Sequence, residues 1–431
     1  MKRTGTPSTI IVTSFVAPRG SMDSIQLEAE PKDVGLDAER LLRIERHFQT
    51  YVDDGRLAGW LVAVSRRGRV AYLATYGKRD IEADLAVEVD TLFRIYSMTK
   101  PITSVAAMML YEEGVFELTD PVSRFIPSFA DTRVYASGPS LAPRTEPSPE
   151  PMQIWHLLSH TSGLTYAANN SHPVDAMYRA ANLLGSAGDF DLATFCDRLG
   201  ALPVMFPPGT RWNYSVSSDV LGRVIEVASG LSLDEFFARR IFEPLGMTDT
   251  SFGTPAEKLD RLAALYTYDA ATGKAVRDDE RGSAARGRPL FLSGGGGLVS
   301  SAMDYNKFTQ MLLREGELDG VRLLGPRTIR YMTQNHLPGG VDLEEIGQKS
   351  FSETRYNGVG FGLGFSVVIN PAKHKVLSSL GEFAWGGAAS TAFWVDPREQ
   401  LTVLFLTQLT PSSSNHIRPE LKQLVYQSII D

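Results

Sequence analysis

The stretch FRIYSMTKPIT, Phe93 to Thr103, places Ser97 three residues before Lys100, with Pro101 directly behind the lysine. Residues three apart on a helix share a face, so the hydroxyl and the amine can meet. Because proline is tolerated in the first turn of a helix but not deeper, the helix is expected to begin near Ser97. Apolar residues at positions 102, 105, 106, 109 and 110 continue it along one face, and Gly114 is a natural stop.

This pair has a chemical and a structural interpretation. A serine hydroxyl is a weak nucleophile and must pass its proton to a nearby base as it attacks. A lysine can serve as that base where burial or a neighbouring cation favours the neutral amine. The backbone N–H of Ser97, at the start of the helix, would also be free to face a developing oxyanion. In the structural interpretation, Ser97 merely caps the helix and Lys100 is solvated.

Length and composition bound what the rest of the chain can be. A chain of 431 residues exceeds the size at which single cores usually stop growing, so two lobes are expected. Its apolar content of 43% and charged content of 22% are ordinary for a globular protein. A net charge of -7 without a dense Lys/Arg tract argues against nucleic acid as a partner. The longest apolar runs are strand-sized and fall short of the ~20 residues that span a membrane.

The cysteine count and the N-terminus bear on the compartment. Cys196 is the only cysteine, so no intrachain disulfide can form, and a cytoplasmic location is expected. Two basic residues near the N-terminus precede a short apolar patch, residues 10–17, which resembles a secretory signal but is interrupted by polar residues. We expect residues 1–30 to be an extension outside the fold, disordered or tag-derived.

Strand patterns gather at the two ends of the chain, and helical patterns lie between them. The expected elements are a helix over residues 36–52, a hairpin over 59–77, strands over 362–369, 389–396 and 401–408, and a helix over 417–430. Consecutive hairpins favour an antiparallel sheet built from both termini. We therefore predict an α+β fold, with an α/β lobe over residues 31–115 and 285–431 and an inserted, mostly helical lobe over 116–284.

Further stretches carry a family resemblance in a fixed order. They are IWHLLSHTSGL (154–164), PPGTRWNYSVSSDVLGRVIEVASGLSLDEFF (207–237), EPLGMTDTSF (243–252), GGGGLVSSAMDY (294–305) and FAWGGAASTAFWVDP (383–397). Together with the first stretch they resemble the serine β-lactamase and penicillin-binding protein superfamily. More narrowly they resemble the family VIII carboxylesterases, which share the class C β-lactamase fold. The resemblance runs from about residue 36 to the C-terminus and implies that fold here.

The resemblance also implies catalytic roles. Ser97 would be the nucleophile, with Lys100 and Tyr214, in WNYSV, as general base and acid. A phenol can do this only if nearby positive charge stabilises its phenolate, and Lys100 is the candidate. The backbone N–H groups of Ser97 and Ala388 would form the oxyanion hole. The alternative for Tyr214 is a buried tyrosine bonded to a backbone carbonyl.

Two departures from the β-lactamases point toward esters. Val216 stands where a Tyr-x-Asn motif would have its asparagine, and Trp385-Gly386-Gly387 stands where Lys-Thr-Gly would be. The family VIII esterases show both changes, and an indole suits a neutral ester better than a β-lactam carboxylate. Trp385, Gly386, Gly387 and Tyr96 are therefore expected to bind substrate. The alternative for Trp385 is plain core packing.

Two other patterns in the sequence resemble known functional motifs. His156 and His160 have the spacing of a zinc helix, but Leu157 stands where a metalloprotease needs glutamate, so capping and packing roles are expected. No Gly-x-Ser-x-Gly nucleophile elbow occurs. The run from Gly294 to Gly297 lacks the lysine of a phosphate-binding loop and predicts a tight backbone turn near the cleft. No metal and no cofactor is expected.

The sequence thus predicts a carboxylesterase that hydrolyses short-chain acyl esters through a Ser97 acyl-enzyme. Its partner would be a small-molecule ester, with no nucleic acid and no membrane. The same residues would serve a β-lactamase or D-amino-acid peptidase, with weak action on cephalosporins as a side activity, or a transacylase. A non-catalytic relative kept for binding is weakened by the presence of all three catalytic residue types.

Overall fold

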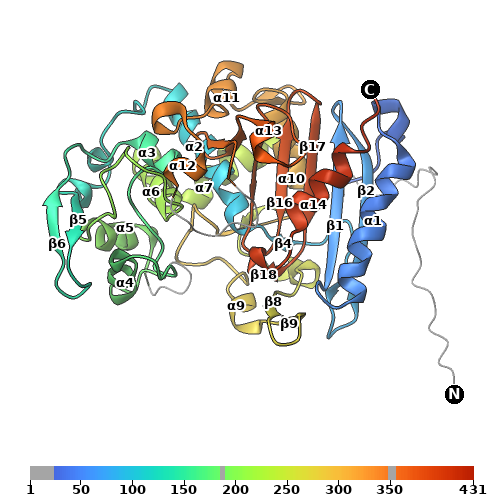
Figure 1. Cartoon of the computed structure of the whole chain (residues 1–431), viewed down its shortest axis with the longest axis horizontal. Coiled ribbons are helices and arrows are strands. Elements are labelled where there is room, and N and C mark those ends of the chain that lie inside the picture. Colours follow the sequence, from blue (N-terminus) through green and yellow to red (C-terminus); the bar gives the residue numbers. More distant parts are fainter. Residues whose placement is uncertain (1–23, 185–189, 348–355) are drawn as a thin grey trace.

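The computed structural model describes residues 24–184, 190–347 and 356–431. Figure 1 shows a sheet with helices on both faces, and beside it a part of the chain in which helices predominate. The two helices expected near the ends of the chain are α1 (Ala38–Asp53) and α14 (Ile417–Tyr426), which pack against each other.

One antiparallel sheet is built from both ends of the chain, which confirms the predicted fold class. Gly364, with φ 99°, turns the chain, so the strand predicted over residues 362–369 begins only at Ser366. Leu61 of the N-terminal hairpin pairs with Leu406 of the last long strand. The strand order is β13 (Val359–Phe361), β14 (Ser366–Val368), β15 (Phe383–Gly386), β16 (Ala392–Asp396), β17 (Leu401–Leu406), β1 (Gly59–Arg66), β2 (Arg69–Asp80) and β3 (Leu85–Ala86).

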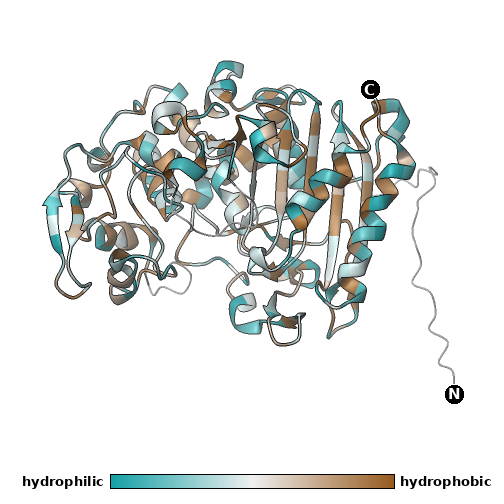
Figure 2. Ribbon diagram, in the orientation of Figure 1, coloured by the Kyte–Doolittle hydropathy of each residue, from teal (hydrophilic) through white to brown (hydrophobic). Residues whose placement is uncertain are grey.

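Alternate side chains of the central strands enter two different cores. On β1, Leu61 belongs to the core shared with α2 (Thr99–Glu112) and α10 (Ala302–Leu313), whereas Val62 belongs to the core shared with α1 and α14. Successive side chains of a strand point to opposite faces, so a strand covered on both sides is apolar throughout. Figure 2 shows these strands largely in brown.

The inserted part of the chain is mostly helical, as predicted. Its longest helix, α6 (Ser217–Ser229), packs against α2, α3 and α5, which brings the loop before α6 close to the start of α2. This part also contains the hairpin β5 (Arg133–Ser137) and β6 (Arg144–Pro147), then α3 (Ile154–Leu158), α4 (Pro173–Ala180), α5 (Leu192–Gly200), α7 (Leu233–Phe237), α8 (Glu243–Leu245) and α9 (Asp279–Ser283).

Two small sheets tie the inserted segment to the main lobe. β10 (Leu298–Ser300) lies between β4 (Phe93–Arg94) and β7 (Ser251–Phe252). β18 (Leu409–Thr410) runs parallel to β8 (Tyr266–Asp269), which also pairs with β9 (Lys274–Arg277). Residues 251–277, which the sequence predicts within the helical lobe, therefore pair their backbone N–H and C=O groups with strands of the α/β lobe. The remaining elements are the hairpin β11 (Glu317–Leu318) and β12 (Val321–Arg322), α11 (Pro326–Met332), α12 (Leu343–Ile346) and α13 (Pro371–His374).

The predicted N-terminal extension, residues 1–30, ends inside the fold. Its apolar patch at residues 10–17 lies outside the described residues. Ile25 is 2% exposed and belongs to the main core, and the N–H groups of Glu28 and Ala29 donate to the carbonyl of Val70. Residues 24–30 therefore cover the edge of β2, and the extension was predicted too long at that end.

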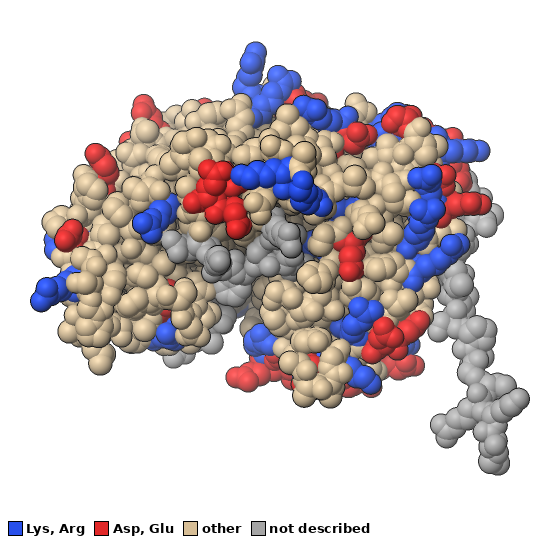
Figure 3. Space-filling view, in the orientation of Figure 1, with Lys and Arg blue, Asp and Glu red and all other residues tan. Residues whose placement is uncertain are grey.

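The surface bears on possible partners. Within residues 24–184, 190–347 and 356–431, no helix has the length and apolar character needed to cross a membrane. On the face drawn in Figure 3, cationic and anionic side chains are interspersed. That face therefore presents no extended field of one sign.

Candidate active site

Ser97 and Lys100 lie where two kinds of helix join. Ser97 is in a 3-10 turn, Tyr96–Met98, and α2 begins directly after this turn, at Thr99. Pro101 therefore lies in the first turn of α2, where proline is tolerated. Lys100 is 1% exposed, and its Nζ donates to Ser97 Oγ over 3.2 Å. The contact predicted from the spacing is therefore present, and Lys100 is not a solvated residue.

The 3-10 turn is fixed on both sides. Tyr96 has φ 43°, a left-handed conformation that few non-glycine residues adopt and that turns Ser97 toward the cavity. Tyr305 of α10 donates its hydroxyl to the carbonyl of Met98 over 2.9 Å. Burial raises the pKa of Tyr96, so its phenol stays neutral.

The amine of Lys100 is enclosed by acceptors and rings. Its Nζ donates to the carbonyl of Gly295 over 2.6 Å. It also lies 4.6 Å from the ring centre of Tyr214 and 5.8 Å from that of Tyr166, and such ring faces attract a cation. The glycine run 294–297 therefore forms the turn near the cleft that the sequence predicts, and it contacts the catalytic lysine candidate directly.

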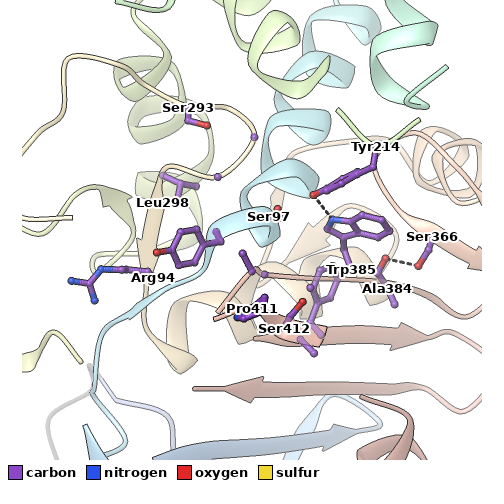
Figure 4. Close-up of a pocket in the computed structure, with 18 of the residues that line it drawn as sticks. Arg94, Ser97, Tyr214, Ser293, Leu298, Ser366, Ala384, Trp385, Pro411 and Ser412 are labelled. Atoms are coloured by element: carbon purple, nitrogen blue, oxygen red, sulfur yellow. Dashed lines mark hydrogen bonds between the residues drawn. The ribbon is translucent and has the colours of Figure 1, made fainter. Parts of the chain in front are cut away.

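Tyr214 is hydrogen-bonded to Trp385 on strand β15. It lies in the loop before α6, and the Nε1–H of Trp385 on β15 donates to its hydroxyl over 3.2 Å, as Figure 4 shows. Trp385 also packs edge-on against Phe361, with ring centres 5.2 Å apart. Both interpretations of Trp385 thus apply, because the indole lines the cavity with one part and packs with another.

The end of β15 approaches the nucleophile turn closely. A Cβ on Gly387 would stand 2.5 Å from the carbonyl oxygen of Ile95 and 2.2 Å from Thr391 Oγ1, so only glycine allows this approach. Ala388 follows and is exposed in the cavity. Neither its N–H nor that of Ser97 donates to another described residue, which leaves both free for an oxyanion.

A cavity of about 550 Å³ collects these groups. Its lining includes six of the predicted residues that flank Ser97, and Lys100 lies beneath the serine. Much of the remaining lining is apolar, which suits an uncharged substrate. The predicted residues are Tyr96, Tyr214, Trp385, Gly386, Gly387 and Ala388, and the apolar or aromatic ones include Tyr166, Leu184, Val216, Leu290 and Phe291.

Burial and the proximity of Lys100 shift the pKa values of the neighbouring groups. Burial and the nearby Lys100 charge hold the pKa of His160 well below its usual range. Burial raises the pKa of Tyr166, and the neighbouring Tyr214 raises it further. Burial also raises the pKa of Asp219, while the nearby Lys100 and hydrogen bonds, among them those from Ser293 and Gly295, act in the opposite direction.

The two histidines with zinc-like spacing have separate structural roles. Helix α3 ends at Leu158, and His160 lies beyond it with φ 56°, so the two rings do not share a helical face. His156 Nδ1 accepts the N–H of Gln153 over 2.9 Å, which caps α3. His160 packs 4.9 Å from the ring of Tyr214. The expected capping and packing roles are confirmed.

Three neighbours of the site were not predicted from the sequence. Asp219, Tyr166 and Ser293 all line the cavity, and only Asp219 left a signal. It is a charged residue five positions after Tyr214, in the first turn of α6. The other two come from segments far apart in the chain.

The chain is similar to known proteins over most of its length. Residues 44–427 match the protein-family model described as Beta-lactamase. The chain belongs to the β-lactamase family. It is 37% identical over 366 residues to Protein Rv1367c of Mycobacterium tuberculosis, a match that covers 84% of this chain and 88% of the relative.

Within that family the relatives include esterases. The chain is 32% identical over 396 residues to Esterase EstB of Burkholderia gladioli, covering 88% of this chain and 93% of EstB. Among solved structures, EstCE1, described as a hydrolase with promiscuous acyltransferase activity, matches with a TM-score of 0.75 at 27% identity. That match covers 91% of this chain and 99% of EstCE1. The chain is therefore a serine β-lactamase-like hydrolase or acyltransferase, similar to the family VIII esterases.

Proposed function

We propose that this protein is a carboxylesterase that hydrolyses short-chain acyl esters through a Ser97 acyl-enzyme. One observation carries the proposal: a fully buried Lys100 whose Nζ lies 3.2 Å from Ser97 Oγ, beneath a largely apolar cavity. Burying a lysine costs stability, and groups buried at such a cost are concentrated at functional sites, which supports a catalytic role for Lys100.

The proposed reaction runs through two transfers. Ser97 Oγ bonds to the ester carbonyl carbon, and its proton passes to Tyr214 and Lys100. The resulting oxyanion accepts the N–H groups of Ser97 and Ala388. The bond to the leaving alcohol then breaks as the same pair returns a proton to it. Water repeats the sequence on the acyl-enzyme and releases the acid.

The choice of an ester over a β-lactam is supported by Trp385. Its indole occupies the place where β-lactamases carry Lys-Thr-Gly, and it donates to Tyr214 rather than presenting a cation to the cavity. A β-lactam carboxylate would gain no charge-assisted bond from an indole. Hydrolysis of cephalosporins is accordingly proposed as a weak side activity.

Transacylation is the second candidate. It is supported by EstCE1, which is described as a hydrolase with promiscuous acyltransferase activity. Both reactions share the acyl-enzyme and differ only in whether water or an alcohol attacks it. A transacylase would turn over faster when an alcohol acceptor is added, whereas an esterase would not.

The test is a p-nitrophenyl ester series from acetate to laurate, measured with the wild type and Ser97→Ala, with and without a short alcohol. We expect turnover to be fastest for the short acyl chains, to be lost in Ser97→Ala by several orders of magnitude, and to be insensitive to the alcohol. A chromogenic cephalosporin should be cleaved far more slowly. Faster cleavage of the cephalosporin than of every ester would overturn the proposal.

We also propose a cytoplasmic location, which Cys196 supports. It is the chain's only cysteine and is fully buried as a free thiol in the core next to α6. Because no disulfide stabilises this fold, its stability does not depend on an oxidising compartment. Fractionation of the source cells tests this, and recovery of the protein outside the cytoplasm would contradict it.

A further inference from the structure

Arg418 of α14 lies against the end of β15, next to the proposed oxyanion hole, and the proposed mechanism gives it no role. Its Nη2 donates to the carbonyl of Gly387 over 3.0 Å and to that of Thr391 over 3.1 Å. A Cβ on Gly386 would stand 2.4 Å from Arg418 Cζ, so the glycine at this position leaves room for the guanidinium to lie directly against the strand.

The two carbonyls belong to the turn that joins β15 to β16. The N–H of Gly387 donates to the carbonyl of Thr391 over 2.9 Å, and the carbonyl of Gly387 accepts the N–H of Ser390 over 3.1 Å. The Gly387 carbonyl thus has two donors, one from the turn itself and a cationic one from α14. Arginine is always charged in proteins, and hydrogen bonds from an ionised donor are stronger than neutral ones. Arg418 therefore holds the first and the last residue of this turn with one nitrogen.

The Gly387 carbonyl and the Ala388 N–H are the two ends of one peptide group. Such a group is planar and trans, so its C=O and its N–H point in opposite directions. The carbonyl faces Arg418, which directs the Ala388 N–H away from the guanidinium. No described residue accepts that N–H, and Ala388 lines the cavity. A cationic donor on the carbonyl also polarises the peptide and makes its N–H a stronger donor.

Helix α14 is fixed to the sheet by the same face that carries Arg418. Lys422 and Tyr426 follow at intervals of four residues, which places the three side chains on one side of the helix. Lys422 pairs with Glu382, which directly precedes β15, and the Tyr426 hydroxyl lies 2.6 Å from a carboxylate oxygen of Glu382 and of Asp396. Helix α14 therefore holds β15 at its start and at its end.

We propose that Arg418 is a positioning residue for the oxyanion hole: it holds the peptide between Gly387 and Ala388 so that the Ala388 N–H faces the oxyanion. This inference rests on the proposed function. As Ser97 Oγ bonds to the ester carbonyl carbon, the carbonyl oxygen gains a negative charge. The Ala388 N–H then meets that charge without having to reorient. Because the charge develops only in the transition state, the effect of Arg418 falls on kcat rather than on KM.

The test compares Arg418 with a second arginine that holds backbone carbonyls. Arg418→Met removes every donor and keeps an apolar stem, whereas Arg418→Lys keeps the charge and a single amine. Arg66→Met is the matched control, because Arg66 is 4% exposed, donates to the carbonyls of Val34 and Gly35 and does not line the cavity.

Three quantities are measured for each variant. They are kcat and KM on p-nitrophenyl butyrate, the unfolding free energy in urea, and the Ki of a trifluoromethyl ketone with a butyl chain. Ser97 Oγ adds to the carbonyl carbon of this ketone, and the oxygen of the adduct takes the place of the oxyanion. Its Ki therefore reports on the oxyanion hole directly.

Arg418→Met should lower kcat about tenfold to a hundredfold with KM unchanged, and raise the Ki of the ketone by the same factor. Arg418→Lys should recover part of both losses. Arg66→Met should lower the unfolding free energy but keep the wild-type kcat and Ki. Unchanged kcat and Ki in Arg418→Met, or in Arg418→Lys should the methionine variant not fold, would overturn the inference, as would an equal effect in Arg66→Met. Failure of the proposed function is distinct, since the wild type itself would then neither cleave the ester nor bind the ketone.

Discussion

The indole N–H of Trp385 donates to the phenol oxygen of Tyr214 over 3.2 Å and so joins strand β15 to the loop before α6. Trp385 thereby connects the strand that leads into the oxyanion-hole candidate Ala388 with the residue proposed to move the proton. Both side chains line the cavity, so this contact joins two segments of the cavity wall that are distant in sequence.

Replacing Trp385 by phenylalanine should lower kcat by about tenfold to a hundredfold, because the phenolate loses one hydrogen-bond donor while the ring remains. KM should change little. Trp60→Phe is the control, since its indole also donates a hydrogen bond, to the carbonyl of Phe48, but in the core behind the sheet. The two variants are compared by steady-state kinetics on p-nitrophenyl butyrate. Equal kcat values for Trp385→Phe and wild type would remove the indole from the mechanism.

Gly387→Ala should reduce activity by at least a hundredfold with the chain still folded. The added Cβ would meet the backbone of Ile95 at 2.5 Å and push the Ala388 amide away from the oxyanion. Gly282→Ala is the matched control, because its Cβ would meet nothing closer than 3.5 Å. Circular dichroism verifies the fold of both variants. A fully active Gly387→Ala enzyme would place the oxyanion hole elsewhere.

Lys100→Met should abolish turnover by at least three orders of magnitude and leave the protein no less stable than the wild type. A buried ammonium is costly to desolvate, and methionine fills a similar volume, although the Gly295 carbonyl loses its donor. The contrast is Lys258→Met, which would leave the carboxylate of Asp249 without one of its partners and should lower stability but not activity. Calorimetry and kinetics on the same preparations measure both effects. A large drop in Tm for Lys100→Met would show that the lysine is structural.

His156 should make the protein sensitive to acid. Burial lowers its pKa from 6.5 to about 4, so the folded state favours the neutral ring that accepts the N–H of Gln153. The resulting stability is fully present above pH 6.5 and declines as the pH falls toward 4, by about 1.4 kcal/mol per pH unit and roughly 3 kcal/mol in total.

The measurement is urea unfolding between pH 7 and pH 4.5. His156→Gln should flatten the pH dependence of the unfolding free energy relative to the wild type. Gln153→Ala should lower stability equally at every pH, because it removes the acceptor of the Trp155 indole without touching a titrating group. The same slope in His156→Gln and wild type would show that another group carries the acid sensitivity.

The parts of the site set by local spacing could be predicted from the sequence. Ser97 and Lys100 are three residues apart, and a single turn brings them together whatever the rest of the chain does. The glycine run at 294–297 was likewise predicted as a tight turn near the cleft. The hairpin and the strands of the C-terminal half followed from short apolar, β-branched-rich runs bounded by turn residues.

The parts set by long-range packing could not be predicted. Asp219 reaches Gly295 across 76 positions in the chain, and Lys100 reaches the same glycine across 195. No local pattern encodes such a meeting. The break in the strand predicted at residue 362 had a similar cause, since Gly364 turns where the N–H of Gly364 bonds the carbonyl of Leu158 in the helical lobe.

The central claim is that Ser97 is the nucleophile. The most direct measurement is the intact mass of the wild type and of Ser97→Ala after exposure to a p-nitrophenyl phosphonate, followed by peptide mapping. The account predicts one adduct on the wild type, located on Ser97, and none on Ser97→Ala, with release of one equivalent of p-nitrophenol. An adduct of equal yield on Ser97→Ala, or one mapped to another residue of the wild type, would contradict it.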